Sequence, residues 1–379
     1  MKIIVAPDSY KGCLTAFEVA DAMEAGIRDA QSDAIIWKIP LADGGEGTVE
    51  AVLRAVGGQK VELTVTGPLG LPQRSFYGIL PDRTTAVIEM AAAAGLPLVP
   101  ARQLNPLVAT TYGVGELIRD AIKRGCRKLI IGLGGSATND GGAGMAAALG
   151  ARLLDAAGKP LPFGGGALGE LRRIETDAML PEIRECEFIA ASDVTNPLCG
   201  EYGASAVFAP QKGATKEMAA LLDRNLAHYA AVIKRDLAKD IAEVSGAGAA
   251  GGLGAGLLAF LSAKIASGLD ILLGLTRFAE KVAMADIVFT GEGKTDRQTV
   301  FGKAPVGIAA AAKKFGKPVV CLSGSVGADV KLLHERGVDV VISVTPAPIP
   351  LEQAIAAAKQ NIRQTAAQIM RAILLGKSL

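Results

Sequence analysis

Short apolar segments rich in β-branched residues alternate with helical patterns along most of this chain. Strands of this kind, separated by helices, form βαβ units in which the strands run parallel. The spacing of Thr15 and Glu18 is that of a capping box and predicts where the first helix begins. We expect the strands at residues 2–6, 35–39, 129–133, 287–291, 319–324 and 338–345, with late helices at 303–314, 328–336 and 351–374.

The alternation is interrupted twice, which indicates a second domain. Residues 60–100 alternate in polarity and are broken by Gly-Pro, Leu-Pro and Pro-Asp pairs, which is typical of antiparallel hairpins. Residues 151–268 are looser, with strands expected within ARLLDAAGKPLPFGGG, FIAASDV and SAVFAP. At 379 residues the chain is long enough for two domains.

We therefore predict an α/β protein whose first domain has a doubly wound, mostly parallel sheet of the Rossmann or flavodoxin type. This discontinuous domain is expected to comprise residues 1–59, 101–150 and 269–379. A mixed α/β domain made of residues 60–100 and 151–268 is expected to be inserted into it. The cleft between the two domains is the expected ligand site.

Composition and charge exclude several function classes. The net charge is +2 and no basic tract is interleaved with aromatic residues, so nucleic acid is not an expected partner. The chain has only two histidines, His228 and His334, which argues against a histidine-based zinc site and a Ser-His-Asp triad. Five cysteines without a CxxC pair, and no signal-peptide pattern, predict free thiols in the cytoplasm.

Residues 244–263 form a stretch of twenty residues without a charged side chain, long enough to span a membrane. Six glycines and two serines lower its hydropathy, so we predict a buried glycine-rich loop and helix, and no membrane partner. Residues 246–251 also match GxGxxG, but they follow a charged helical segment, whereas a dinucleotide-binding motif follows a strand.

Loops that combine glycine with polar residues follow several of the predicted strands. In parallel sheets these loops meet at the carboxyl edge, where ligands bind. Glycine lets a ligand approach the backbone, and a helix N-terminus attracts anions. Any one of these loops can be a well-capped turn, but together they favour a phosphate-binding site. They lie at residues 7–12, 40–48, 134–141, 291–296 and 323–325.

Carboxylates and lysines are concentrated in the same loops. Mg²⁺ prefers oxygen ligands, a carboxylate can accept the proton of an attacking hydroxyl, and a lysine can offset phosphoryl charge. The pattern indicates Mg²⁺-assisted phosphoryl transfer, although residues 291–295 lack the first glycine of a Walker A loop. For Asp193 an Asx turn before Asn196 and Pro197 is the structural alternative. The residues concerned are Asp8, Lys11, Asp43, Glu46, Asp140, Asp193, Lys294 and Asp296.

The chain resembles the bacterial class I glycerate kinases in motifs that extend from the first strand past residue 300. The resemblance implies two α/β domains, one of them discontinuous, and transfer of the γ-phosphoryl group of ATP, with Mg²⁺, to D-glycerate. It further implies 2-phosphoglycerate as product and a place in glyoxylate, glycolate or sugar-acid catabolism. The motifs are APDSYKG (6–12), PLADGGEGT (40–48), GLGGSATNDGGAGMAAALGA (132–151), ASDVTNPLCG (191–200), GASAVFAPQKGA (203–214), GAGAAGGLG (246–254) and FTGEGKTDRQT (289–299).

Individual roles are assigned from side-chain chemistry as hypotheses. Asp193 is the expected general base, with Lys11 and Asp296 as further catalytic residues. Asp8, Ser9, Lys11 and Arg297 are expected to bind the substrate. Asp43, Glu46 and Asp296 are expected to position Mg²⁺. The residues expected to bind ATP phosphates are Gly134, Gly135, Ser136, Thr138, Asn139, Asp140, Gly141, Gly291, Gly293 and Lys294.

Three other functions stay open at this point: a kinase for another small hydroxy acid, a nucleotide-linked dehydrogenase, and a non-catalytic nucleotide or sugar-acid sensor. The choice between C2 and C3 of glycerate depends on the placement of the hydroxyl against the γ-phosphate. A homodimer is one expectation, and the sequence does not decide the oligomeric state.

Overall fold

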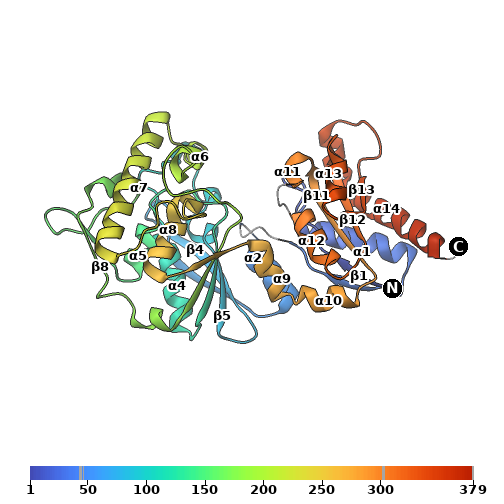
Figure 1. Ribbon diagram of the computed structural model, residues 1–379, viewed down its shortest axis with the longest axis horizontal. Coiled ribbons are helices and arrows are strands. Elements are labelled where there is room, and N and C mark those ends of the chain that lie inside the picture. Colours follow the sequence, from blue (N-terminus) through green and yellow to red (C-terminus); the bar gives the residue numbers. More distant parts are fainter. Residues whose placement is uncertain (42–44, 46, 301–303, 378–379) are drawn as a thin grey trace. The chain divides into compact units, whose positions relative to one another are not determined.

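The computed structural model describes residues 1–41, 45, 47–300 and 304–377, which fold into two compact units. Unit 1 comprises Met1–Ala42 and Leu269–Leu379, and unit 2 comprises Asp43–Gly268. Both units combine sheets with helices (Figure 1), so the predicted α/β fold class is confirmed.

Unit 1 is built on a five-stranded sheet in which every pair is parallel. Its strands are β1 (Lys2–Val5), β2 (Ile35–Lys38), β11 (Ile287–Thr295), β12 (Val319–Val326) and β13 (Val340–Ser343). Their order in the sheet is β2-β1-β11-β12-β13. This is the order of flavodoxin-like sheets, in which the chain winds in both directions from the middle.

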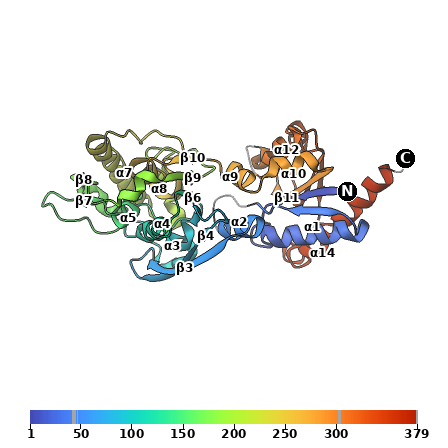
Figure 2. The same cartoon turned by 90° about the horizontal axis from the view of Figure 1, so that it is seen from below.

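The helices of unit 1 pack around this sheet and against one another. They are α1 (Ala16–Ala30), α9 (Gly268–Leu275), α10 (Phe278–Met284), α11 (Arg297–Val300), α12 (Ala304–Lys313), α13 (Val330–Glu335) and α14 (Leu351–Lys377). Figure 2 shows α1 and α14 on one face and α10 and α12 on the other. Helix α1 begins with the predicted capping box, in which Thr15 and Glu18 exchange hydrogen bonds. It approaches α14 closely at Gly26, where a Cβ atom would lie 2.0 Å from the Arg363 carbonyl oxygen.

Unit 2 contains a six-stranded mixed sheet in the order β10-β9-β6-β5-β4-β3 and a separate antiparallel pair, β7-β8. The residues of the six-stranded sheet are β3 (Gln59–Thr66), β4 (Pro72–Ile79), β5 (Thr85–Glu89), β6 (Lys128–Gly132), β9 (Glu187–Ala191) and β10 (Lys264–Ala266). The pair is β7 (Arg152–Leu154) and β8 (Arg173–Glu175). Strands β3 and β4 form the antiparallel hairpin predicted for residues 60–100, whereas β5, β6, β9 and β10 are parallel.

The helices of unit 2 pack around this sheet. They are α2 (Thr48–Val56), α3 (Ala91–Ala94), α4 (Tyr112–Lys123), α5 (Ala143–Ala148), α6 (Ala204–Phe208), α7 (Lys216–Leu237) and α8 (Ala249–Leu261). Apolar side chains of α4 and α8 contribute to one large core with β5 and β6. The segment SAVFAP, expected as a strand, forms α6 instead, because a short apolar run has the composition of either a buried strand or a buried helical turn.

The division into units differs from the expected domains at two segments, residues 43–59 and 101–150. Strand β6 pairs through Ile130 with Val87 of β5 on one side and Ile189 of β9 on the other, so its whole βα unit belongs to unit 2. Helix α2 packs against β4 and β5. A βα pattern does not show which sheet its strand joins, because that choice depends on hydrogen bonds to strands elsewhere in the chain. The expected cleft between the domains stays a prediction.

Candidate active site

The direction of winding in unit 1 reverses between β1 and β11. From β1 the chain continues to β2, and from β11 it continues to β12 and β13 on the other side. In open α/β sheets the loops at such a reversal separate at the carboxyl edge and leave a crevice for ligands. The loop with Asp8, Ser9 and Lys11 follows β1, and Asp296 with Arg297, the first residue of α11, follows β11. The structure therefore brings these predicted residues to one edge.

Backbone contacts hold the loop after β1 against β11. The Asp8 N–H donates to the Gly291 carbonyl at 2.8 Å, and the Ser9 N–H donates to the Asp8 carboxylate at 2.6 Å. The Tyr10 hydroxyl is buried and donates to the Leu322 carbonyl at 2.9 Å. Asp8 and Ser9 are half-buried and Lys11 is exposed. The lysine is thus presented to solvent from an anchored loop.

Glycines at the carboxyl end of β11 allow this close packing. A Cβ atom on Gly291 would lie 2.2 Å from the Leu322 carbonyl oxygen of β12. A Cβ atom on Gly293 would lie 3.2 Å from the Cα atom of Tyr10. Gly291 is buried and Gly293 is half-buried. Both glycines therefore have a packing role, in addition to the predicted phosphate-binding one.

A buried polar network supports the turn that carries Asp296. Glu292, which is 4% exposed, accepts hydrogen bonds from the Thr295 hydroxyl at 3.1 Å and the Thr299 hydroxyl at 2.6 Å. The Thr299 hydroxyl also accepts from the Asp296 N–H at 3.2 Å. Glu292 was not among the residues predicted from the sequence, although the two threonines that follow it at three and seven residues could have indicated it.

The charged residues at the carboxyl end of β11 lie nearer the surface. The Asp296 carboxylate, which is half-buried, pairs with the Lys294 ammonium group at 3.1 Å. Lys294 and Arg297 are exposed. The exposed Lys294 and Arg297 can attract an anionic ligand at the reversal point, and the Asp296 carboxylate can hold a metal ion there.

The parallel strands of unit 2 form a second carboxyl edge. The Leu133 N–H donates to the Ala191 carbonyl at 3.1 Å, which places the loop after β6 beside the loop after β9. Gly134 is half-buried and Gly135 is exposed on the first loop. Asp193 is exposed on the second, where its carboxylate accepts from the Gly268 N–H at 3.1 Å. The predicted base and the predicted phosphate-binding loop therefore share this edge.

The rest of the predicted phosphate-binding loop turns into the interior. Thr138 and Asn139 are fully buried, and Asp140 is 1% exposed. The Asp140 carboxylate accepts from the Thr111 N–H and hydroxyl at 2.8 and 2.9 Å, and from two further backbone N–H groups, of Gly142 and Gly144. Burial raises the pKa of Asp140, and these hydrogen bonds oppose the shift. Asp140 thus stabilises the start of α5 from inside.

A lysine that the sequence analysis did not select lies beneath this loop. Lys212 is 1% exposed, and its ammonium group donates to the Ser136 hydroxyl and to the Thr138 carbonyl, both at 2.7 Å. Burial lowers its pKa to about 7, and the charge of Asp140 opposes that shift. The available signal was a single charged residue in the otherwise uncharged segment 203–214.

The shifted pKa of Lys212 predicts a pH-dependent stability. An unfolded lysine has a pKa of about 10.4, so between pH 7 and 10 the unfolded chain binds a proton that the folded chain does not. The free energy of unfolding should therefore rise with pH, by at most about 1.4 kcal/mol per pH unit. We expect the difference in unfolding free energy between wild type and Lys212→Met, measured in urea, to become more favourable to wild type from pH 7 to pH 9. Parallel pH profiles would contradict this.

The glycine-rich segment 246–256 packs against the same loop. The Gly141 N–H donates to the Gly251 carbonyl at 3.0 Å. Gly251 has a φ of +67°, and a Cβ atom on it would lie 2.0 Å from the Thr138 carbonyl oxygen. Helix α7 and an irregular loop precede the segment. Both predictions for it are therefore confirmed: it is a buried loop and helix, and it lacks the strand that a dinucleotide-binding motif requires.

Asp43 and Glu46, the predicted Mg²⁺ residues of the 40–48 loop, lie outside the described residues. The Glu89 carboxylate at the end of β5 is 2% exposed and accepts from the N–H groups of Gly47 at 3.2 Å and Val49 at 2.5 Å. Glu89, which the sequence analysis also missed, holds the start of α2 at the carboxyl edge. Within the part of the chain that the structure describes, no three potential metal ligands form a cluster.

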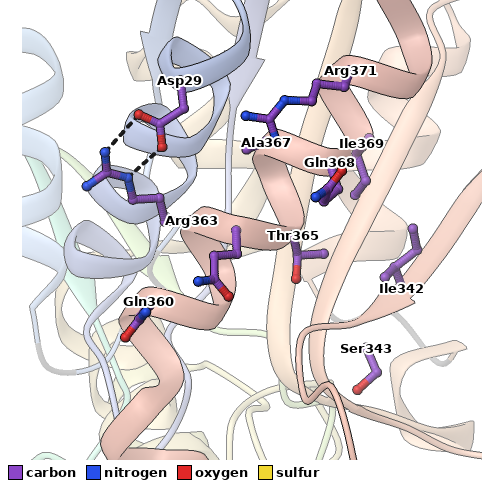
Figure 3. Close-up of a pocket in the computed structure, with 11 residues that line it drawn as sticks. Asp29, Ile342, Ser343, Gln360, Arg363, Thr365, Ala367, Gln368, Ile369 and Arg371 are labelled. Atoms are coloured by element: carbon purple, nitrogen blue, oxygen red, sulfur yellow. Dashed lines mark hydrogen bonds and ion pairs between the residues drawn. The ribbon is translucent and has the colours of Figure 1, made fainter. Parts of the chain in front are cut away.

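A hollow of about 730 Å³ lies on unit 1, beside α14 and β13. Figure 3 shows Asp29 and Arg363 pointing toward one another across part of it, joined by two hydrogen bonds of 2.6 and 2.7 Å. Its described lining includes none of the predicted site residues. Among the described residues, no helix is both long and apolar enough to cross a membrane.

The fold and the site together define an α/β protein whose strand-end loops suit anionic small-molecule ligands. Residues 3–374 match the model of the glycerate kinase family. The chain is 48% identical to a glycerate kinase of Bacillus subtilis (strain 168), over 100% of this chain and 99% of that one. It is 49% identical to a glycerate 2-kinase of Escherichia coli (strain K12), over 99% of both chains.

A solved structure described as a candidate glycerate kinase 2 from Salmonella typhimurium LT2 superposes with a TM-score of 0.89, at 48% identity and with 100% of both chains covered. This chain belongs to the glycerate kinase family.

Proposed function

We propose that this protein transfers the γ-phosphoryl group of ATP to D-glycerate and releases ADP and 2-phospho-D-glycerate. The observation that carries the proposal is full-length identity of 48–49% to a glycerate kinase and a glycerate 2-kinase. The strand-end loops support it, since phosphoryl transfer depends on positioning and on charges that stabilise the phosphate oxygens. Supply of glycerate by glyoxylate, glycolate or sugar-acid catabolism stays a prediction.

Asp193 is the proposed general base for the glycerate hydroxyl. It is exposed at the end of β9, and the hydrogen bond from Gly268 fixes one carboxylate oxygen. A carboxylate held in this way can accept a proton while the oxygen that loses it attacks phosphorus. The backbone N–H groups of Gly134, Gly135 and Ser136 are proposed to bind ATP phosphates at the same edge, while the Ser136 hydroxyl is buried and accepts a hydrogen bond from Lys212. The buried residues after them shape the loop.

In unit 1, Lys11 is proposed to bind the substrate carboxylate, with Asp8, Ser9 and Arg297 around it. Lys294, Gly291 and Gly293 are proposed to contact phosphate. The donors present fit Mg²⁺, which is usually held by one or two carboxylates together with phosphate oxygens. Asp296 would hold the ion, and Asp43 and Glu46 are further candidates. When bound, Mg²⁺ supplies positive charge to the phosphate oxygens.

Replacing Lys11 with alanine should raise KM for D-glycerate about 10- to 100-fold, because a charge-assisted hydrogen bond contributes about 1.5–3 kcal/mol. Steady-state kinetics measure this. Lys2→Ala is the matched control, since Lys2 is an exposed lysine at the opposite end of β1. An unchanged KM in Lys11→Ala would remove Lys11 from the substrate site.

The proposal is tested by ADP release from MgATP with D-glycerate and by ³¹P NMR of the product. Turnover with phosphate on C2 is the expected result. Phosphate on C3 would support the assignment as a glycerate kinase and change the proposed position of phosphorylation from C2 to C3. Turnover with another small hydroxy acid but none with D-glycerate would overturn the substrate assignment.

A further inference from the structure

Lys212 reaches the proposed phosphate-binding loop from the interior of unit 2. It lies in a short helical turn, Pro210–Lys212, between α6 and α7. Its side-chain nitrogen donates hydrogen bonds to Ser136 and Thr138, which flank Ala137 on the loop. One side chain, 74 residues away in sequence from Thr138, therefore holds two points of a single turn.

The other side of this turn is held by main-chain bonds to residues 94–96. The Ala137 N–H donates to the Ala94 carbonyl at 2.9 Å, and the Leu96 N–H donates to the Gly135 carbonyl at 2.8 Å. Gly135, with a φ of +77°, comes directly before Ser136 and is exposed. The directions of the N–H groups at Gly134 to Ser136 thus depend on a turn that two sets of hydrogen bonds hold in place. One set comes from the main chain of residues 94–96, and the other comes from the buried side chain of Lys212.

Packing alone does not require a lysine at this position. Burying the amino group of a lysine costs desolvation energy, whereas a methionine of similar length would fill the same space without that cost. What a methionine cannot do is donate hydrogen bonds to the Ser136 hydroxyl and the Thr138 carbonyl. Loss of these donors would leave two buried acceptors unsatisfied and release the turn.

We infer that Lys212 is a positioning residue that sets the conformation of the loop from Gly134 to Thr138 for binding of ATP phosphates. The inference rests on the proposed function, since it assigns the loop to ATP. Lys212 is buried and acts through the backbone of the loop, so it is not expected to touch either substrate.

The test compares Lys212→Met with wild type by steady-state kinetics in both substrates. We expect KM for MgATP to rise about tenfold or more while KM for D-glycerate stays within about twofold, because only the nucleotide loop is released. Thr85→Val is the control. It removes a buried hydroxyl that donates to Asp82 at 2.6 Å, at the opposite end of β5 in the same unit. If Lys212→Met damages unit 2 in general, KM for D-glycerate will rise together with KM for MgATP, or Thr85→Val will change KM for MgATP to the same extent. Either result would overturn the inference.

Ser136→Ala removes the partner of one of the two hydrogen bonds and should raise KM for MgATP in the same direction. Combined with Lys212→Met it should add little, because the two changes break the same contact. Fully additive effects would contradict the inference, and Ser136→Ala keeps it testable if Lys212→Met fails to fold.

If wild type does not turn over D-glycerate, the proposed function fails. Calorimetric titration of ATP into wild type and Lys212→Met then tests Lys212 separately, with equal affinities overturning it.

Discussion

Replacing Asp193 with asparagine is expected to lower kcat about 10²- to 10⁴-fold, the usual contribution of a general base. The amide oxygen can still accept the hydrogen bond from the Gly268 N–H, so the loop after β9 should keep its conformation. The amide cannot take up the proton of the glycerate hydroxyl. Steady-state kinetics should therefore show a loss in kcat with KM for MgATP nearly unchanged.

The control for this variant is Asp155→Asn. Asp155 also accepts backbone hydrogen bonds in a loop of unit 2, from the N–H groups of Ala157 and Lys159. It lies beside the β7-β8 pair, in a region to which no catalytic role is assigned. If Asp193→Asn folds and turns over at the wild-type rate, Asp193 is not the general base. Its role is then the structural one of a hydrogen-bond acceptor in a turn.

Replacing Gly251 with alanine should destabilise unit 2 by about 4 kcal/mol, the sum of a left-handed backbone cost and an overpacking cost. The backbone φ is +67°, and the new methyl group would lie 2.0 Å from the Thr138 carbonyl oxygen. That oxygen cannot move away easily, because it accepts the hydrogen bond from Lys212. Thermal unfolding should shift downward by about 8–16 °C for a unit of this size.

Gly158→Ala separates the two costs. Gly158 has a similar φ of +74° in the same unit, but open space surrounds the position of its Cβ atom. Only the left-handed conformation is penalised there, so the expected loss is about 1–2 kcal/mol. Equal destabilisation by the two substitutions would show that the contact between Gly251 and Thr138 is not tight in solution.

The position of the candidate site at strand ends could be predicted from the sequence. Parallel strands place their carboxyl ends at one edge, so any polar loop after such a strand is expected there. Asp8, Lys11 and Asp296 were predicted on this basis, and β1 and β11 are adjacent in the sheet. The hairpin at residues 60–100 followed from its alternating pattern. The buried loop and helix at residues 244–263 followed from the glycines and serines that lower the hydropathy of this uncharged stretch, and the charged helical segment before residues 246–251 argued against a dinucleotide-binding motif.

The assignment of βα units to the two sheets could not be predicted in the same way. Residues 101–150 have the same alternation as the two ends of the chain, yet β6 pairs with β5 and β9 in unit 2. Pairing partners are chosen by shape and apolar contacts across the whole unit. A local pattern of strand and helix contains no information on that choice.

Composition and spacing identified residues 134–141 as a loop between a strand and a helix. They also showed that this loop is rich in glycine and in polar side chains. They did not indicate which of those groups reach solvent. Asp140 turns inward because Thr111 and the start of α5 supply its hydrogen bonds, and Lys212 fills the space beneath Ser136. Thr111 and Asp140 are separated by 29 positions in the sequence, and Ser136 and Lys212 by 76. The cost of burying a charged or polar group is offset only when such distant partners meet in the folded chain.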